Sequence, residues 1–131
     1  MILGGAMIYV KDFPVMREFY ARLLRAAPRN SEWTEMFAEF ACGETTFSLH
    51  AVPPEIAEAI AITRPPVPRE EVPVKLTFAT DDLEGVRDRL RQLGAAVIER
   101  PWQADAREFD FVDPEGNIVR VVRREPALRK R

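Results

Sequence analysis

The stretch FDFVDPEGNIVRVV, residues 109–122, carries the strongest fold signal in the chain. Apolar residues dominate on both sides of DPEGN, as expected of two β-strands joined by a tight turn. Pro114 presets φ at the first central position of the turn, and Gly116 can adopt the left-handed backbone that begins the return strand. The segment therefore predicts a β-hairpin whose apolar second strand contains one unexpected cation, Arg120.

Two amphipathic helices are predicted at an offset of 70 residues (13 to 83). Their apolar residues recur in steps of 3, 4 and 3, which place them on one helix face. Each helix follows a β-like run, GAMIYV (5–10) or KLTFAT (75–80), and begins after an aspartate that can cap it. The apolar positions are Phe13, Met16, Tyr20 and Leu23 in the first helix, and Leu83, Val86, Leu90 and Leu93 in the second.

Further β-like runs follow each helix, so the chain reads as two copies of one strand-helix-strand-strand(-strand) unit. The proline-rich segment TRPPVPREEVP separates the copies. We predict one domain over residues 1–123, with a first module at about 1–62, a linker at 63–73 and a second module at 74–123. A basic tail occupies 124–131. The later runs are WTEMFAEFA (33–41), TTFSLHAV (45–52), AAVIER (95–100), REFDFV (107–112) and NIVRVV (117–122).

Composition excludes several classes of function. The formal net charge is -2, but residues 123–131 hold five basic residues and one acid, so the rest carries 14 minus 20, or -6. An acidic body argues against nucleic acid as a partner. One cysteine and one histidine exclude a His- or Cys-rich metal site. The absence of a long apolar run and of a signal-peptide pattern predicts a cytoplasmic protein with no membrane partner.

These motifs in this order resemble the vicinal oxygen chelate superfamily, which includes glyoxalase I, extradiol dioxygenases, fosfomycin-resistance transferases and bleomycin-resistance proteins. The resemblance rests on REFY (17–20), TDDLEGVRDRLRQLG (80–94) and FVDPEGNIVRVV (111–122). It implies an α+β fold of two βαβββ modules that form a curved mixed sheet around a cleft, with the helices on the outer face. It also implies a homodimer.

Metal-dependent members of that superfamily take one ligand from each of four strands, typically His or Gln, Glu, His and Glu. The spacing from Asp12, Asp82 and Asp113 carries these positions onto Gly5, Lys75 and Arg120, and the remaining one corresponds to Ser48. Glycine offers no side chain, and two cations repel a divalent ion. We therefore predict no metal and no cofactor.

Strand alternation places Tyr9 on the face of Gly5, and His50 on the face of Ser48. Trp33 and Trp102 lie on irregular segments, where an aromatic ring can stack on a ligand. Lys75 and Arg120 need anionic partners, either an anionic group on a ligand or the carboxylate of Glu35, Glu39, Glu108 or Asp110. The predicted ligand-binding residues are Tyr9, Trp33, Ser48, His50, Lys75, Trp102 and Arg120.

The sequence thus favours a metal-independent protein that binds a small molecule, an antibiotic or aromatic metabolite, closest in character to the bleomycin-resistance-like members. One alternative is a lyase, isomerase or dioxygenase-like enzyme that uses Lys75 and Arg120, or an unrecognised metal site, to stabilise an oxyanion. Another is a structural or regulatory module that binds a protein.

Overall fold

The computed structural model describes residues 1–103 and 107–124, and divides into two compact units. The first unit comprises Met1–Val67 together with Pro114–Gly116, and the second comprises Pro68–Asp113 together with the residues from Asn117 onward. The boundary after Val67 falls within the predicted linker. Apart from Arg124, the predicted basic tail lies outside the described residues.

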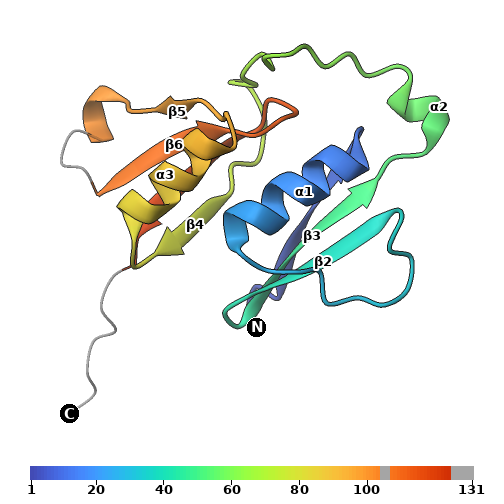
Figure 1. Ribbon diagram of the computed structural model, residues 1–131, viewed down its shortest axis with the longest axis horizontal. Coiled ribbons are helices and arrows are strands. Elements are labelled where there is room, and N and C mark those ends of the chain that lie inside the picture. The colour runs from blue at the N-terminus through green and yellow to red at the C-terminus, as the bar shows by residue number, and fades with distance from the viewer. Residues whose placement is uncertain (104–106, 125–131) are drawn as a thin grey trace. The chain divides into compact units, whose positions relative to one another are not determined.

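The first unit is a three-stranded sheet with one long helix across one of its faces (Figure 1). Its strand order is β1-β3-β2, with β1 parallel to β3 and β2 antiparallel to it. Helix α1 buries its apolar stripe on the face that carries Phe40, Phe47 and Leu49, and the rings of Tyr20 and Phe47 lie 4.9 Å apart. The elements are β1 (Gly5–Val10), α1 (Phe13–Leu24), β2 (Phe37–Cys42), β3 (Thr45–Ala51) and the short α2 (Pro54–Ala57).

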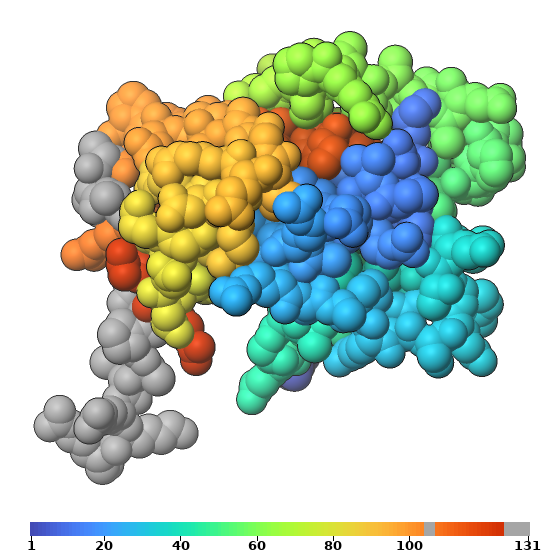
Figure 2. Space-filling view, in the orientation of Figure 1, coloured from blue at the N-terminus to red at the C-terminus, as the bar shows by residue number. Residues whose placement is uncertain are grey.

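Local sequence explains where α1 begins and ends. The Asp12 side chain accepts a hydrogen bond from the backbone N–H of Val15, and a proline stands in the first turn, as is common at helix starts. Arg25 ends the helix in the left-handed conformation, with φ 54°. The short α2 begins at a proline, buries no residue and lies at the surface as part of the green segment in Figure 2.

The first unit has one strand fewer than a βαβββ module. The segment before β2 runs beside that strand, and the backbone N–H of Arg29 donates to the carbonyl of Glu39 at 2.8 Å. The next contact uses a side chain, because Asn30 Oδ1 accepts from the N–H of Glu39 at 3.0 Å. The amide of Asn30 thus replaces the backbone partner that a further strand would supply.

The second unit is a complete βαβββ module with strand order β4-β7-β6-β5 (Figure 1). Strands β4 and β7 are parallel, and the other pairs are antiparallel. Helix α3 buries Leu83, Val86 and Leu90, and the strands bury Phe109, Phe111, Val119 and Val121. The elements are β4 (Thr77–Thr80), α3 (Leu83–Gln92), β5 (Val97–Ile98), the 3-10 helix η1 (Pro101–Gln103), β6 (Glu108–Val112) and β7 (Ile118–Arg123).

The predicted mixed α+β fold of strand-helix-strand modules is therefore confirmed, with two mixed sheets that do not close into a barrel. The predicted hairpin is also present as β6 and β7. Its turn is fixed by Asp113, whose carboxylate accepts from the backbone N–H of Asn117 at 3.0 Å and from its side-chain amide at 2.8 Å. Gly116 has φ 88°, which explains the glycine at this position. None of the helices in the described residues is long and apolar enough to cross a membrane.

Candidate functional site

The second sheet has a buried carboxylate at its centre. Asp110 lies in the middle of β6, on the face opposite to Phe109 and Phe111, and none of its surface is exposed to solvent. Arg120 stands directly across from it on β7, with Arg120 Nε 3.3 Å from Asp110 Oδ1. The cation that interrupts the apolar strand thus forms a cross-strand ion pair.

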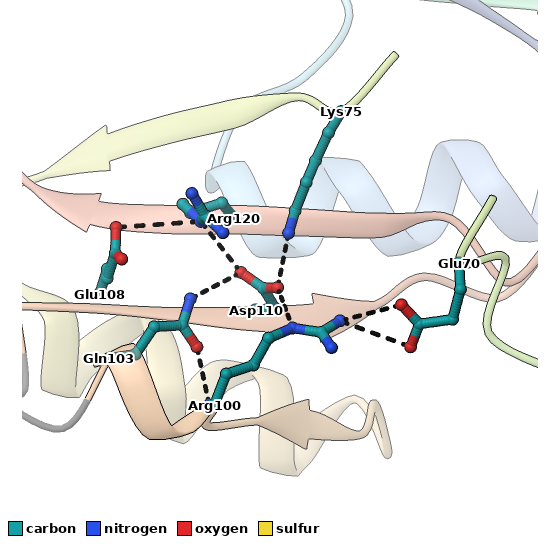
Figure 3. Close-up of polar contacts among 7 residues, drawn as sticks. All are labelled: Glu70, Lys75, Arg100, Gln103, Glu108, Asp110 and Arg120. Atoms are coloured by element: carbon teal, nitrogen blue, oxygen red, sulfur yellow. Dashed lines mark hydrogen bonds and ion pairs between the residues drawn. The ribbon is translucent and has the colours of Figure 1, made fainter. Parts of the chain in front are cut away.

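Two more cations reach Asp110 from the two edges of the sheet (Figure 3). Lys75 precedes edge strand β4 and places Nζ 2.7 Å from Asp110 Oδ2. Arg100 follows edge strand β5 and places Nε 3.0 Å from the same oxygen. Gln103, in η1, donates to Asp110 Oδ1 at 3.0 Å. We call these residues, Asp110, Lys75, Arg100, Gln103 and Arg120, the Asp110 cluster.

The cluster keeps Asp110 ionised. Burial by itself raises the pKa of this carboxyl, but the hydrogen bonds from Lys75, Arg100 and Gln103 outweigh burial and lower the pKa to about 2. The hydrogen bond to Asp110 raises the pKa of Arg100 in turn. At neutral pH the cluster therefore contains one fixed anion among three fixed cations.

Of the predicted carboxylate partners, Asp110 is the residue that holds both Lys75 and Arg120. Glu108 lies farther away, with Oε2 3.8 Å from Arg120 Nε. Glu39 pairs with Arg29 at 3.2 Å instead. The expectation that the two cations meet a carboxylate of the protein is thus confirmed for Asp110.

Sequence reasoning missed Arg100 and Gln103. A signal for Arg100 was present, because it stands two residues after Ile98, whose partner across the sheet is Asp110. Continued alternation places Arg100 on the face of Asp110. Gln103 belongs to a short 3-10 turn, which has no comparable periodic pattern.

Trp102 lies between the two residues that were missed and points a largely exposed side chain outward, with 66% of its surface accessible. The guanidinium carbon of Arg100 lies 5.7 Å from the centre of its ring. This is a cation–π distance, so Trp102 is linked to the Asp110 cluster through Arg100.

On the first sheet, three ring side chains form a row across the strands. Tyr9 on β1 and Phe37 on β2 are both paired with His50 on β3. The ring centres lie 5.5 Å apart for Tyr9 and His50, and 6.0 Å apart for Phe37 and His50. Tyr9 is 62% exposed, and the neighbouring Met7 is exposed as well. We call Tyr9, His50 and Phe37 the ring row.

One hydrogen bond sets the tautomer of His50. Its Nδ1 lies 2.7 Å from the carbonyl oxygen of Ala51, and since a carbonyl only accepts, Nδ1 carries the hydrogen. In neutral His50, Nε2 is then a hydrogen-bond acceptor. The ring row therefore offers flat apolar surface together with one acceptor atom.

The other two residues predicted for this unit differ in access. Ser48 lies on β3 between Met7 and Glu39 and is nearly buried. Trp33 lies just before β2, with φ 55° and 69% of its surface exposed. The structure therefore brings Tyr9 and His50 together, and likewise Lys75 and Arg120, within their own units.

The four positions that match the superfamily's metal ligands do not fit a divalent ion. Lys75 and Arg120 are cations paired with Asp110, and Ser48 offers one hydroxyl. A Cβ at Gly5 would lie 2.6 Å from Thr46 Oγ1 and 2.7 Å from the Thr46 carbonyl oxygen. Within residues 1–103 and 107–124, no three His, Cys, Asp or Glu side chains gather as a metal site would require.

The close approach at Gly5 gives a stability prediction. Gly5→Ala should lower the free energy of unfolding by about 1–3 kcal/mol, because the new methyl group forces β1 away from the backbone of β3. Gly4→Ala is the matched control, since a Cβ there meets nothing within 4 Å. Urea denaturation of the two variants measures the difference. Equal midpoints would show that β1 and β3 are not held this closely.

The comparisons with known proteins agree with this architecture. Two strand-helix-strand units, the second of which contains the hairpin strands β6 and β7, make up this α+β architecture. The glyoxalase-like domain matches residues 6–122, so the chain belongs to the glyoxalase-like family, within the vicinal oxygen chelate superfamily. A search of curated proteins finds no match.

Solved structures share the fold at low sequence identity. A glyoxalase/dioxygenase from Nostoc punctiforme is similar with a TM-score of 0.70 and 18% identity, over 95% of this chain and 92% of that chain. A glyoxalase/bleomycin resistance protein from Catenulispora acidiphila gives 0.65 and 20%, over 95% and 100%. The fosfomycin resistance protein FosX from Mesorhizobium loti gives 0.65 and 16%, over 93% and 92%. At these identities the similarity concerns the fold alone.

Proposed function

We propose that this protein binds a small molecule, an antibiotic or an aromatic metabolite, without the help of a divalent metal. The observation that carries the proposal is the chemistry of the four ligand positions. They hold Gly5, where a side chain does not fit, Ser48, and two cations anchored on Asp110. Such a set repels a divalent ion and suits an organic ligand.

The ring row supports an aromatic ligand. Tyr9 and Phe37 flank an imidazole whose Nε2 accepts a hydrogen bond, and Tyr9 is largely exposed. A planar molecule can stack on such rings and donate to His50. Two structural neighbours are described as resistance proteins, one for bleomycin and one for fosfomycin, which is in keeping with a small-molecule ligand.

Tryptophan fluorescence tests the proposal, because Trp33 and Trp102 are both exposed and can report on a bound ligand. A panel of aromatic antibiotics and aromatic metabolites should include compounds that quench the emission saturably. Tyr9→Ala should weaken the binding of such a compound by about three- to tenfold, the contribution of one stacked ring. A comparison of Trp33→Phe with Trp102→Phe shows which tryptophan is quenched, and therefore which unit the compound contacts.

Ile56→Ala is the control, since Ile56 is half exposed on α2 and is not part of the ring row. If no compound in the panel binds, or if Ile56→Ala weakens binding as much as Tyr9→Ala, the proposal is wrong. Proton NMR of the bound mixture over several hours separates binding from turnover. A new product peak would favour the alternative, an enzyme of the lyase, isomerase or dioxygenase type.

We also propose that the protein is a cytoplasmic homodimer that binds no nucleic acid. The acidic body supports the last point, since phosphate contacts need a basic surface. The homodimer rests on the resemblance stated above. Sedimentation velocity of the purified protein measures the oligomeric state.

A further inference from the structure

The Asp110 cluster contains more donors than its central carboxylate can use. Each oxygen of Asp110 accepts two hydrogen bonds, from Lys75 and Arg100 at Oδ2, and from Gln103 and Arg120 at Oδ1. A carboxylate has about four acceptor sites, so Asp110 is fully used. Any further N–H group of the cluster therefore needs another anion as its hydrogen-bond acceptor.

Arg120 and Lys75 hold these further N–H groups. Arg120 donates to Asp110 through Nε, and its Nη1 and Nη2 make no hydrogen bond to residues 1–103 and 107–124. Lys75 gives one hydrogen bond, to Asp110. The side chains are 28% and 36% exposed, respectively, so solvent reaches both.

Two hydrogen-bonded carboxylates serve three cations, so one positive charge of the cluster lacks a hydrogen-bonded anion of its own. Arg100 is shared between Asp110 and Glu70, whose Oε2 lies 3.3 Å from Arg100 Nη2. With Asp110 and Glu70 counted against three cations, one positive charge remains on Lys75 and Arg120. Glu108 offsets part of it from 3.8 Å, which is beyond hydrogen-bond distance.

We propose that Arg120 and Lys75 form a subsite for one carboxylate group of a small aromatic acid. The two Nη groups of Arg120 offer the planar fork that matches a carboxylate, and Lys75 adds a point charge beside it. Asp110 positions both side chains, and its own negative charge is offset by the three cations bonded to it. This inference rests on the proposed function, and it names a carboxylate as the chemical group that the second unit binds.

A titration with benzoate and its neutral analogue benzamide tests the subsite. Binding is followed by the shifts of the arginine Nε–Hε and backbone amide peaks in ¹H–¹⁵N NMR spectra. Benzoate should bind about tenfold more tightly than benzamide, which is the effect of a charge-assisted contact. The peaks of Arg120 should shift with benzoate.

Three variants assign the preference to named side chains. Arg120→Lys keeps the charge beside Asp110 but removes the fork, and should reduce the preference for benzoate to about threefold or less. Lys75→Gln should reduce it as well. Glu108→Gln should strengthen benzoate binding by about two- to fivefold and leave benzamide unchanged, because a competing carboxylate is lost. Arg91→Gln, in an exposed pair with Asp88 on α3, is the control and should change nothing.

Equal affinity for benzoate and benzamide would overturn the subsite, as would a preference that survives Arg120→Lys and Lys75→Gln. The proposed function would stand in either case if other members of the panel bind. Inorganic phosphate that displaces benzoate at equal concentration would replace the carboxylate assignment with a general oxyanion site. If no panel compound and neither probe binds, both proposals are wrong.

Discussion

Asp110→Asn is expected to lower the free energy of unfolding by about 3–5 kcal/mol, the usual cost of removing one partner from a buried ion pair. The substitution keeps the shape of the side chain but leaves Lys75, Arg100 and Arg120 without their shared anion. Three like charges then face one another on a partly buried surface. Urea denaturation at neutral pH measures the loss.

Asp88→Asn provides the control, because Asp88 forms an exposed ion pair with Arg91 and should cost less than about 1 kcal/mol. A loss for Asp110→Asn as small as that of the control would mean that the cluster contributes little to stability.

Asp110 also makes the free energy of unfolding depend on pH in the acid range. Its folded pKa of about 2 lies below the ordinary value of 3.8, so its stabilisation is complete above about pH 5 and is lost as the pH falls through 2.

The wild-type protein should therefore lose about 2 kcal/mol of stability through this group between about pH 5 and pH 2. Asp110→Asn cannot titrate at this position, so the stability difference between the two proteins should shrink by that amount over the same interval. A constant difference would show that Asp110 has an ordinary pKa.

Glu115→Ala is expected to cost about 2–4 kcal/mol, since it leaves two backbone N–H groups without their acceptor. Glu115 stands in the DPEGN turn and is 5% exposed. Its carboxylate accepts from the N–H of Lys11 at 2.9 Å and from the N–H of Asp12 at 2.7 Å, where β1 passes into α1. Thermal or urea unfolding measures the change.

Glu115→Gln separates charge from hydrogen bonding, because the amide keeps one carbonyl acceptor and should cost about half as much. Glu55→Ala, on the exposed first turn of α2, serves as the control for loss of a surface carboxylate. If Glu115→Ala is no more destabilising than Glu55→Ala, the turn does not hold the start of α1.

Local patterns in the sequence predicted most of the fold. Alternation placed Tyr9 on the face of Gly5 in β1, where its side chain is exposed, and a 3.6-residue period located α1 and α3. These signals succeed because each strand or helix buries one side. The DPEGN turn was predicted correctly because a turn position with a positive φ favours glycine, and Gly116 has such a φ.

Contacts between distant residues had no such signal. Glu115 is 104 residues away from Lys11, and no local pattern reveals that its carboxylate accepts from that backbone. The first unit lacks a fourth strand, and the side chain of Asn30 accepts the hydrogen bond from Glu39 that the backbone of such a strand would accept. Gln103 reaches Asp110 from a short 3-10 turn. Such contacts depend on tertiary packing, so they need the structure.

Arg120 connects the fold with the proposed function. At the position that the resemblance assigns to the last metal ligand, this chain has a guanidinium group anchored by Asp110. The same substitution that disfavours a divalent ion provides donors for an anionic group. We therefore expect a ligand that binds through its organic functional groups and not through a shared metal ion.

The most direct test titrates a binding compound from the fluorescence panel into the protein before and after exhaustive dialysis against a chelator. Metal content is measured on the same samples. We expect the same dissociation constant in both samples, with no stoichiometric divalent ion in either. Binding that disappears with the chelator and returns with one equivalent of a divalent metal would contradict this expectation.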